Sequence, residues 1–275
     1  MKKWIYKILT VAMAVNLVGC SDNNSGDTPY TYPPRVGTSY IQQIIPMESL
    51  DSYLYYNFEV DEAEKYIYYT KVKKTQADCM YAVSDGIAFV VHPVPLVQGH
   101  GISATLEDTP EGRYFRDFVA GLGDNACEIP FYPLSVLCDA SVTDPSVSSM
   151  TITCDKSFSA LMLAGTNLNS LFRCYFENPY LVIANSYKQP VGDNIYKVDT
   201  APHYSLAFPS AVVGSRLDEI DFSQIVTIGA TWILELTSAP ETTDTYTFTI
   251  SVKKENGETL STQLAPIQIK GSNDI

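Results

Sequence analysis

The stretch from Thr245 to Ile269, TYTFTISVKKENGETLSTQLAPIQI, decides the fold class of this chain. Its first eight residues alternate between hydroxyl-bearing and apolar or aromatic side chains, the period of a β-strand with one buried face. Asn256-Gly257 follows and is typical of a type I′ turn, and Thr259 to Ile269 returns as a partner strand. The sequence therefore predicts a C-terminal β-hairpin with one core-facing row, namely Tyr246, Phe248, Ile250 and Val252.

Other segments repeat the strand pattern. Ile225 to Leu236 precedes the hairpin and extends it to a predicted β-meander. Ser52 to Val60 and Lys65 to Val72 are rich in aromatic and β-branched residues and are joined by four mostly acidic residues, which predicts two strands and a turn. Tyr81 to Val91 predicts a strand pair or bent strand. Many short, turn-separated strands are typical of a mainly β protein, an antiparallel β-sandwich or sandwiches.

One short helix is predicted near residues 110–120. Thr109 suits the N-cap, Pro110 the first helical position and Gly121 the C-terminal stop. The apolar face of this helix is predicted to hold Tyr114, Phe115, Phe118 and Val119.

The N-terminus has the pattern of an export signal. Residues 1–7 carry three lysines and no acid, and Ile8 to Val18 contains only Thr10 and Asn16 as polar members. A membrane-spanning helix needs about 20 apolar residues, so this run is too short to span the bilayer. We therefore expect residues 1–19 to be a signal peptide.

Leu17-Val18-Gly19-Cys20 closes the apolar run and resembles the lipobox of bacterial lipoproteins. The resemblance implies cleavage before Cys20 and lipid attachment to its thiolate, with acyl chains such as palmitate as the membrane anchor. The next residues, SDNNSGD, resemble the tract found in outer-membrane and surface lipoproteins of the Bacteroidota, and they equally suit a flexible polar tether. The implied location is the outer membrane, on the cell surface or the periplasmic face.

The chain thus divides into a signal peptide at 1–19, a flexible tether at 20–38 and a β-rich body at 39–275. The body is one large domain, or two domains split near 141–149, where the sequence is polar and broken by Pro145.

Charge restricts the partners of the body. The whole chain has a net charge of −13, and signal cleavage lowers the basic side chains from 18 to 15 against 31 acidic ones, for a net charge of −16. Such a surface repels phosphate backbones, so we expect no nucleic-acid partner. The expected partners are the bilayer, through Cys20, and an extracellular glycan or protein ligand.

Five cysteines remain beside Cys20 in a compartment that permits disulfides. Proximity in sequence suggests Cys127 with Cys138 and Cys154 with Cys174, leaving Cys79, while buried unpaired thiols are the alternative. No CxxC spacing supports a redox or zinc role.

The sequence contains no motif that predicts a catalytic, cofactor-binding or metal site. Its three histidines are His92, predicted near a strand end, His100, predicted in a loop between two glycines, and His203, which follows Pro202. Paired carboxylates of the kind a glycosidase needs are weak candidates because acidic turns explain them better; they are Glu107-Asp108, Asp218-Glu219 and Glu62 with Glu64.

Six tyrosines form a candidate carbohydrate platform, since tyrosine rings stack on sugars and their hydroxyls donate hydrogen bonds. They could line a cross-strand ladder, although strand propensity and core packing explain them better; they are Tyr53, Tyr55, Tyr56, Tyr66, Tyr68 and Tyr69. Trp232 is predicted in the core.

The leading functional hypothesis is a non-enzymatic binding or structural module, anchored at the envelope and without a cofactor. One alternative is an envelope glycan hydrolase. Another is a fimbrial or adhesin subunit, for which Arg35-Val36 would be a processing bond.

Overall fold

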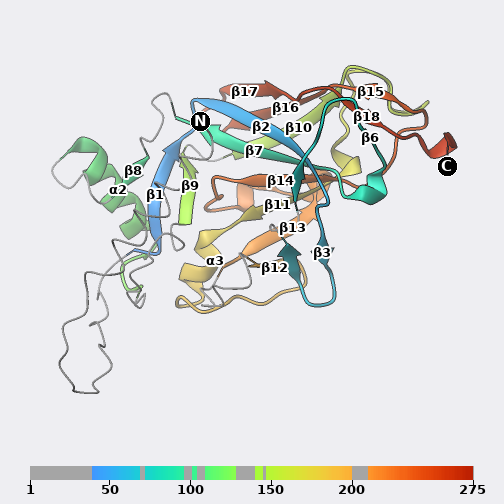
Figure 1. Ribbon diagram of the computed structural model, residues 1–275. Coiled ribbons are helices and arrows are strands. Elements are labelled where there is room, and N and C mark those ends of the chain that lie inside the picture. The colour runs from blue at the N-terminus through green and yellow to red at the C-terminus, as the bar shows by residue number, and fades with distance from the viewer. Residues whose placement is uncertain are drawn as a thin grey trace, which may run out of the picture. The chain divides into compact units, whose positions relative to one another are not determined.

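The computed structural model describes residues 39–68, 72–95, 101–103, 109–127, 140–144, 147–199 and 210–274, and the structural statements below refer to these. The fold is mainly β, with four sheets whose pairings are mostly antiparallel, as predicted (Figure 1). Neither described α-helix combines the length and the hydropathy needed to cross a bilayer.

The largest sheet has nine strands in the order β3-β4-β12-β13-β11-β14-β7-β2-β5. Their bounds in this order are Val60–Asp61, Tyr66–Tyr68, Ile195–Asp199, Val212–Arg216, Phe172–Glu177, Trp232–Leu236, Ala88–Val94, Ser49–Tyr56 and Lys73–Lys74.

Three smaller sheets have three strands each among the described residues. The first is β10 (Val147–Cys154), β16 (Phe248–Lys254) and β17 (Thr259–Gln263); the second is β8 (Ile102–Ser103), β1 (Ile41–Pro46) and β9 (Ala140–Asp144); the third is β15 (Asp244–Tyr246), β18 (Ile267–Ile269) and β6 (Met80–Tyr81). The α-helices are α2 (Pro110–Gly121) and α3 (Pro179–Ala184), and 3₁₀ turns occur at Val83–Asp85, Asn169–Leu171, Leu217–Glu219, Phe222–Gln224 and Ser272–Asp274.

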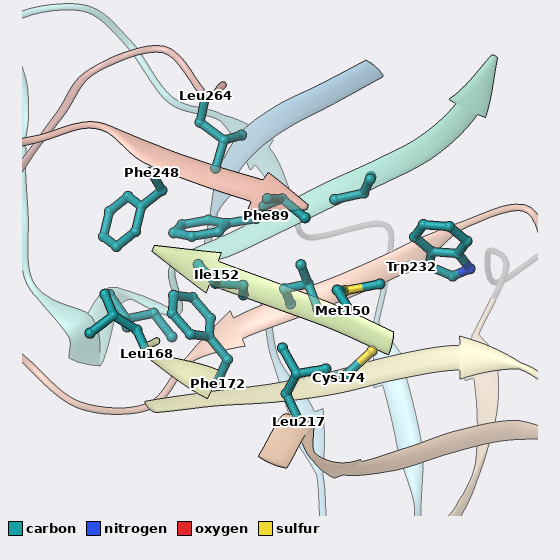
Figure 2. Packing of buried hydrophobic residues seen from close by; sticks show 14 of the residues in the cluster. Phe89, Met150, Ile152, Leu168, Phe172, Cys174, Leu217, Trp232, Phe248 and Leu264 are labelled. Atoms are coloured by element: carbon teal, nitrogen blue, oxygen red, sulfur yellow. The ribbon is translucent and has the colours of Figure 1, made fainter. Parts of the chain in front are cut away.

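A sandwich core lies between the nine-stranded sheet and the β10-β16-β17 sheet. Both sheets contribute alternate side chains to it, as strand geometry requires. The ring of Phe248 on β16 lies 4.8 Å from that of Phe89 on β7 and 6.0 Å from that of Phe172 on β11 (Figure 2). The predicted sandwich therefore forms between the C-terminal hairpin, to which β10 from the middle of the chain is added, and a sheet assembled from strands between residues 49 and 236.

The opposite face of the nine-stranded sheet is buried as well. Tyr175 on β11 and Ile233 on β14 pack there against Phe58 and Ile67, which come from the segment around β3 and β4. The sheet curls over this second cluster. A third cluster joins α2 and α3 to the β8-β1-β9 sheet; its buried members include Phe115, Val119, Ile41, Val142 and Val182.

The C-terminal hairpin is confirmed, but its turn differs from the prediction. β16 pairs with β17, and all four predicted core residues are buried. Gly257 has a φ of +89°, whereas Asn256 is not among the residues with positive φ. The amide of Gly257 donates to the Lys254 carbonyl and the amide of Lys254 donates to the Glu258 carbonyl. This is a three-residue loop, a type I turn followed by a left-handed glycine, rather than type I′.

Two predicted strand arrangements are wrong. β14 does not extend the hairpin into a meander; it pairs with β11 and β7 and faces β16 across the core. Likewise β2 pairs with β7 and β5, whereas β4 pairs with β3 and β12, so the tyrosine ladder between β2 and β4 does not form. In both cases strand propensity identified the strand, but the partner depends on which distant residues complete the core.

The predicted helix is confirmed as α2, and Thr109 Oγ1 accepts the Gly112 amide at 3.0 Å. Phe115 and Val119 are buried, whereas Tyr114 is exposed and donates to Asp144 at 2.7 Å. The left-handed glycine after the helix is Gly123, with a φ of +72°, rather than Gly121.

The proposed Cys154–Cys174 disulfide is wrong, because both thiols are free and buried in the sandwich core. Cys138 lies outside the described residues. Burial raises the pKa of Cys154 to about 11 and also raises the pKa of Cys174. Because the thiolate is the reactive species, burial and the raised pKa each slow the reaction of both thiols.

Alkylation should report this difference. We expect iodoacetamide at pH 8 to modify exposed Cys79 in the folded protein at least ~10-fold faster than Cys154 or Cys174. Peptide mass spectrometry over a time course measures the three rates, and denatured protein is the control in which they should converge. Equal rates in the folded protein would contradict the burial of these thiols.

Candidate functional site

Charged and tyrosine side chains gather on the curled face of the nine-stranded sheet. Arg173 and Tyr175 alternate with core residues along β11, and Glu235 on β14 lies opposite Arg173 in the strand register. We call this group the Arg173 cluster; it comprises Glu62, Lys65, Arg173, Tyr175, Tyr196 and Glu235.

Glu62 connects the turn between β3 and β4 to this face. Its carboxylate forms an ion pair with Arg173, another with Lys65 at 2.9 Å, and accepts the Tyr196 hydroxyl at 2.9 Å. Burial acts to raise the pKa of Glu62, but the hydrogen bonds from Lys65 and Tyr196 and the charge of Arg173 together hold it below its ordinary value. Glu62 is therefore an anchored carboxylate.

The pKa of Glu235 is shifted in the opposite direction to that of Glu62. Burial raises its pKa, and the Tyr175 hydroxyl, which donates to it at 2.9 Å, only partly offsets this effect. Two carboxyl groups near one arginine therefore have pKa values shifted in opposite directions, an arrangement found in acid–base pairs of hydrolases.

A glycine allows the two tyrosines of the cluster to pack. The rings of Tyr175 and Tyr196 meet edge to face with centroids 5.4 Å apart, and a Cβ atom on Gly214 of β13 would lie 2.6 Å from both rings. The Lys65 ammonium lies 4.9 Å from the Tyr196 ring centroid. The cluster is thus a rigid, mutually satisfied network that fastens the β3–β4 turn to the sheet.

Glu177, at the end of β11, carries a second carboxyl group that is largely, but not fully, buried. The hydroxyl of Tyr40 lies 3.5 Å from its Oε1, and burial raises its pKa to about 7. The carboxyl is therefore mostly protonated at mildly acidic pH and costs stability when it ionises.

This pKa predicts a pH dependence of stability. The folded-state pKa of about 7 lies above the ordinary value of 4.5, so the contribution of Glu177 to stability is full below pH 4.5 and is lost as pH rises to 7. The shift corresponds to at most about 3.4 kcal/mol, and because Glu177 retains partial exposure we expect about 2 kcal/mol.

Urea unfolding at pH 5 and pH 8 measures this effect. Relative to wild type, Glu177→Gln should gain about 1.5 kcal/mol at pH 8 over its value at pH 5, because part of the contribution is already lost at pH 5. The same change at exposed Glu255 is the control and should leave the pH profile unchanged. An identical profile for wild type and Glu177→Gln would contradict the raised pKa.

The structure separates the histidine candidates. His92 lies in β7, its Nδ1 is 3.1 Å from Thr231 Oγ1, and burial lowers its pKa. His100, His203 and the pair Glu107-Asp108 lie outside the described residues.

Of the remaining carboxylate candidates, only Glu62 enters the cluster. The second carboxyl group of the cluster is that of Glu235, whereas Glu64 is exposed and lies outside the cluster. Asp218 and Glu219 both pair with Arg216 on a 3₁₀ turn, at 2.7 and 3.5 Å.

Sequence reasoning missed six members of these sites: Lys65, Arg173, Tyr175, Glu177, Tyr196 and Glu235. A signal existed for three of them, because residues 172–177, FRCYFE, alternate between core-forming Phe and Cys and the polar or aromatic Arg, Tyr and Glu. This alternation predicts a strand with one core-facing row and a second row, Arg173, Tyr175 and Glu177, on the other face of the sheet. No local pattern links them to Glu62, 111 residues away from Arg173.

The tyrosines predicted as a platform divide between two places. On β4, the rings of Tyr66 and Tyr68 lie 6.4 Å apart with an angle of 25° between their planes, and Lys197 lies 5.4 Å from the Tyr66 ring. On β2, the Tyr53 hydroxyl donates to Asp51 and the Tyr53 ring lies 6.3 Å from that of Tyr55. Both pairs are partly exposed. Tyr56 packs on Tyr81, Trp232 is fully buried, and Tyr69 lies outside the described residues.

No group of three or more histidine, cysteine, aspartate or glutamate side chains within the described ranges is placed to hold a metal ion. No protein-family model matches the chain, and neither the curated proteins nor the solved structures yield a match.

Proposed function

We propose that this protein is a lipoprotein of the bacterial envelope, anchored by acyl chains on Cys20, whose β-rich body is a non-enzymatic binding or structural module. The observation that supports the anchor is the Leu17-Val18-Gly19-Cys20 sequence behind a short apolar run. Its location would be the outer membrane, with the body on the cell surface or the periplasmic side.

Two features support this role, the first on the structural side and the second on the binding side. The carboxylates of the Arg173 cluster all receive hydrogen bonds within the protein, as expected of a network that stabilises a fold. The partly exposed tyrosines on β2 and β4 offer rings and hydroxyls to a glycan or protein ligand.

The anchor is tested on whole cells. Protease treatment of intact cells, with mass spectrometry of the N-terminal peptide, compares wild type with Cys20→Ala. Acylated Cys20 in wild type supports the proposal, and an unmodified N-terminus overturns it. Surface cleavage separates display on the cell surface from a periplasmic body.

The binding role is tested with the mature chain on glycan and peptide arrays. The double variant Tyr66→Ser, Tyr68→Ser should bind the captured ligand at least ~10-fold more weakly, since aromatic side chains that become buried on binding dominate such sites. Alanine at exposed Thr259 and Gln263 on β17 is the matched control. Absence of any ligand together with hydrolysis of a surface polymer would overturn the role.

The second candidate is an envelope glycan hydrolase, favoured by the opposite pKa shifts of Glu62 and Glu235. In that role Glu235 would be the general acid and Glu62 the base or nucleophile. Glu235→Gln should then lower kcat at least ~100-fold on the hydrolysed glycan, whereas Glu64→Gln should not. Retention of kcat by Glu235→Gln would exclude this assignment.

A further inference from the structure

The loop between β10 and the next strand presents an apolar tip to solvent. From Ser157 to Phe172 the chain carries no charged side chain. Leu161 is 93% exposed and Leu163 is 58% exposed, whereas Met162 between them packs against the sandwich core. The loop therefore turns one side chain inward and two leucines outward.

This loop is tied to the free edge of β10. The amides of Gly165 and Leu168 donate to the carbonyls of Cys154 and Ile152, each at 2.8 Å. The side chain of Asn169 accepts the Ile152 amide at 3.0 Å and donates to the Met150 carbonyl at 2.8 Å. The exposed leucines thus sit on a pre-ordered turn, and burying them against another surface requires little further ordering of the backbone.

We propose that the Leu161–Leu163 tip inserts into the bilayer to which the chain is anchored, an inference that rests on the proposed lipoprotein function. As a tether, the 18 residues 21–38 would reach at most about 60 Å when fully extended. Anchoring keeps the tip at high local concentration near the bilayer, so two leucines suffice for partial insertion. The segment from Ser157 to Phe172 brings no charged side chain of its own into hydrocarbon, although the Glu241 carboxylate accepts the Ala160 amide beside the tip at 3.0 Å. The acidic body directs insertion to zwitterionic rather than anionic lipid.

A fluorophore beside the tip tests insertion. The mature chain with Cys20→Ala, Cys79→Ser and Cys138→Ser receives an N-terminal histidine tag, and exposed Ala164→Cys carries an environment-sensitive dye. The three native cysteines that remain, Cys127, Cys154 and Cys174, are buried. The protein is held on phosphatidylcholine vesicles through a nickel-chelating lipid. We expect a blue shift of emission and quenching by lipid-borne spin labels, both lost when Leu161 and Leu163 become serine. The control carries the dye on Glu255→Cys at an exposed position, where the emission should remain typical of water.

The outcomes separate this inference from the proposed function. Emission typical of water at residue 164 on vesicles overturns insertion, whatever the state of native Cys20. A blue shift that grows with protein concentration without vesicles overturns it as well, because the occupant is then a second copy of the chain. Insertion on nickel lipid with an unmodified native Cys20 supports the tip but overturns the lipoprotein proposal.

Discussion

Replacing Phe248 with alanine is expected to lower the free energy of unfolding by about 4 kcal/mol, the largest loss we predict for a single side chain. Phe248 is fully buried where the two sheets of the sandwich meet. Its ring lies between 4.8 and 6.4 Å from four other aromatic rings, those of Phe89, Phe172, Phe158 and Tyr246. These rings come from several elements, so the cavity cannot close by moving one of them.

Equilibrium urea unfolding measures the loss. Phe248→Leu, which keeps most of the apolar volume, is the matched control and should cost about 1.5 kcal/mol. A loss below about 1 kcal/mol for Phe248→Ala, at an unchanged dependence on urea, would mean that the site relaxes and that the sandwich core is less closely packed than described.

Gly214→Ala is expected to lower the free energy of unfolding by about 3 kcal/mol, although alanine is otherwise the better strand residue. The added Cβ would lie 2.6 Å from the rings of Tyr175 and Tyr196. Both rings must move, and their hydroxyls then lose Glu235 and Glu62 as acceptors. The loss of stability thus has two causes, overpacking and the loss of two hydrogen bonds to charged groups.

Gly121→Ala is the matched control because a Cβ there meets no atom within 4 Å. Its stability should equal that of wild type or exceed it by up to about 1 kcal/mol, since alanine is the better helix former. Equal behaviour of the two variants would contradict the close approach of the tyrosine rings to β13. Proteolysis between β3 and β4 gives a second readout, since that turn is held by Glu62 and should be cut faster in Gly214→Ala.

Much of the fold could be predicted from local patterns. The alternation in Thr245 to Val252 placed four side chains in the core, and the N-cap at Thr109 placed α2. These predictions succeeded because strand alternation and helix capping depend on residues a few positions apart.

Strand partners could not be predicted in the same way. β14 lies close to the hairpin in sequence but pairs with β11 and β7, because its alternate residues fill both the sandwich core and the curled face. β2 and β4 pair with different strands, rather than with each other, for the same reason. Pairing is decided by which surfaces can be buried together, and this is a property of the whole chain.

The candidate site follows the same division. The sequence by itself determined the strands of the C-terminal hairpin, helix α2, the acidic charge and the lipobox-like N-terminal pattern, because each depends on neighbouring residues or on composition alone. Only the tertiary structure brought Glu62 to Arg173 and Tyr196, and buried Glu177 and Glu235 so that their pKa values rise. Desolvation and ion pairing depend on distances across the fold, and those distances are fixed by packing between sheets rather than by spacing along the chain.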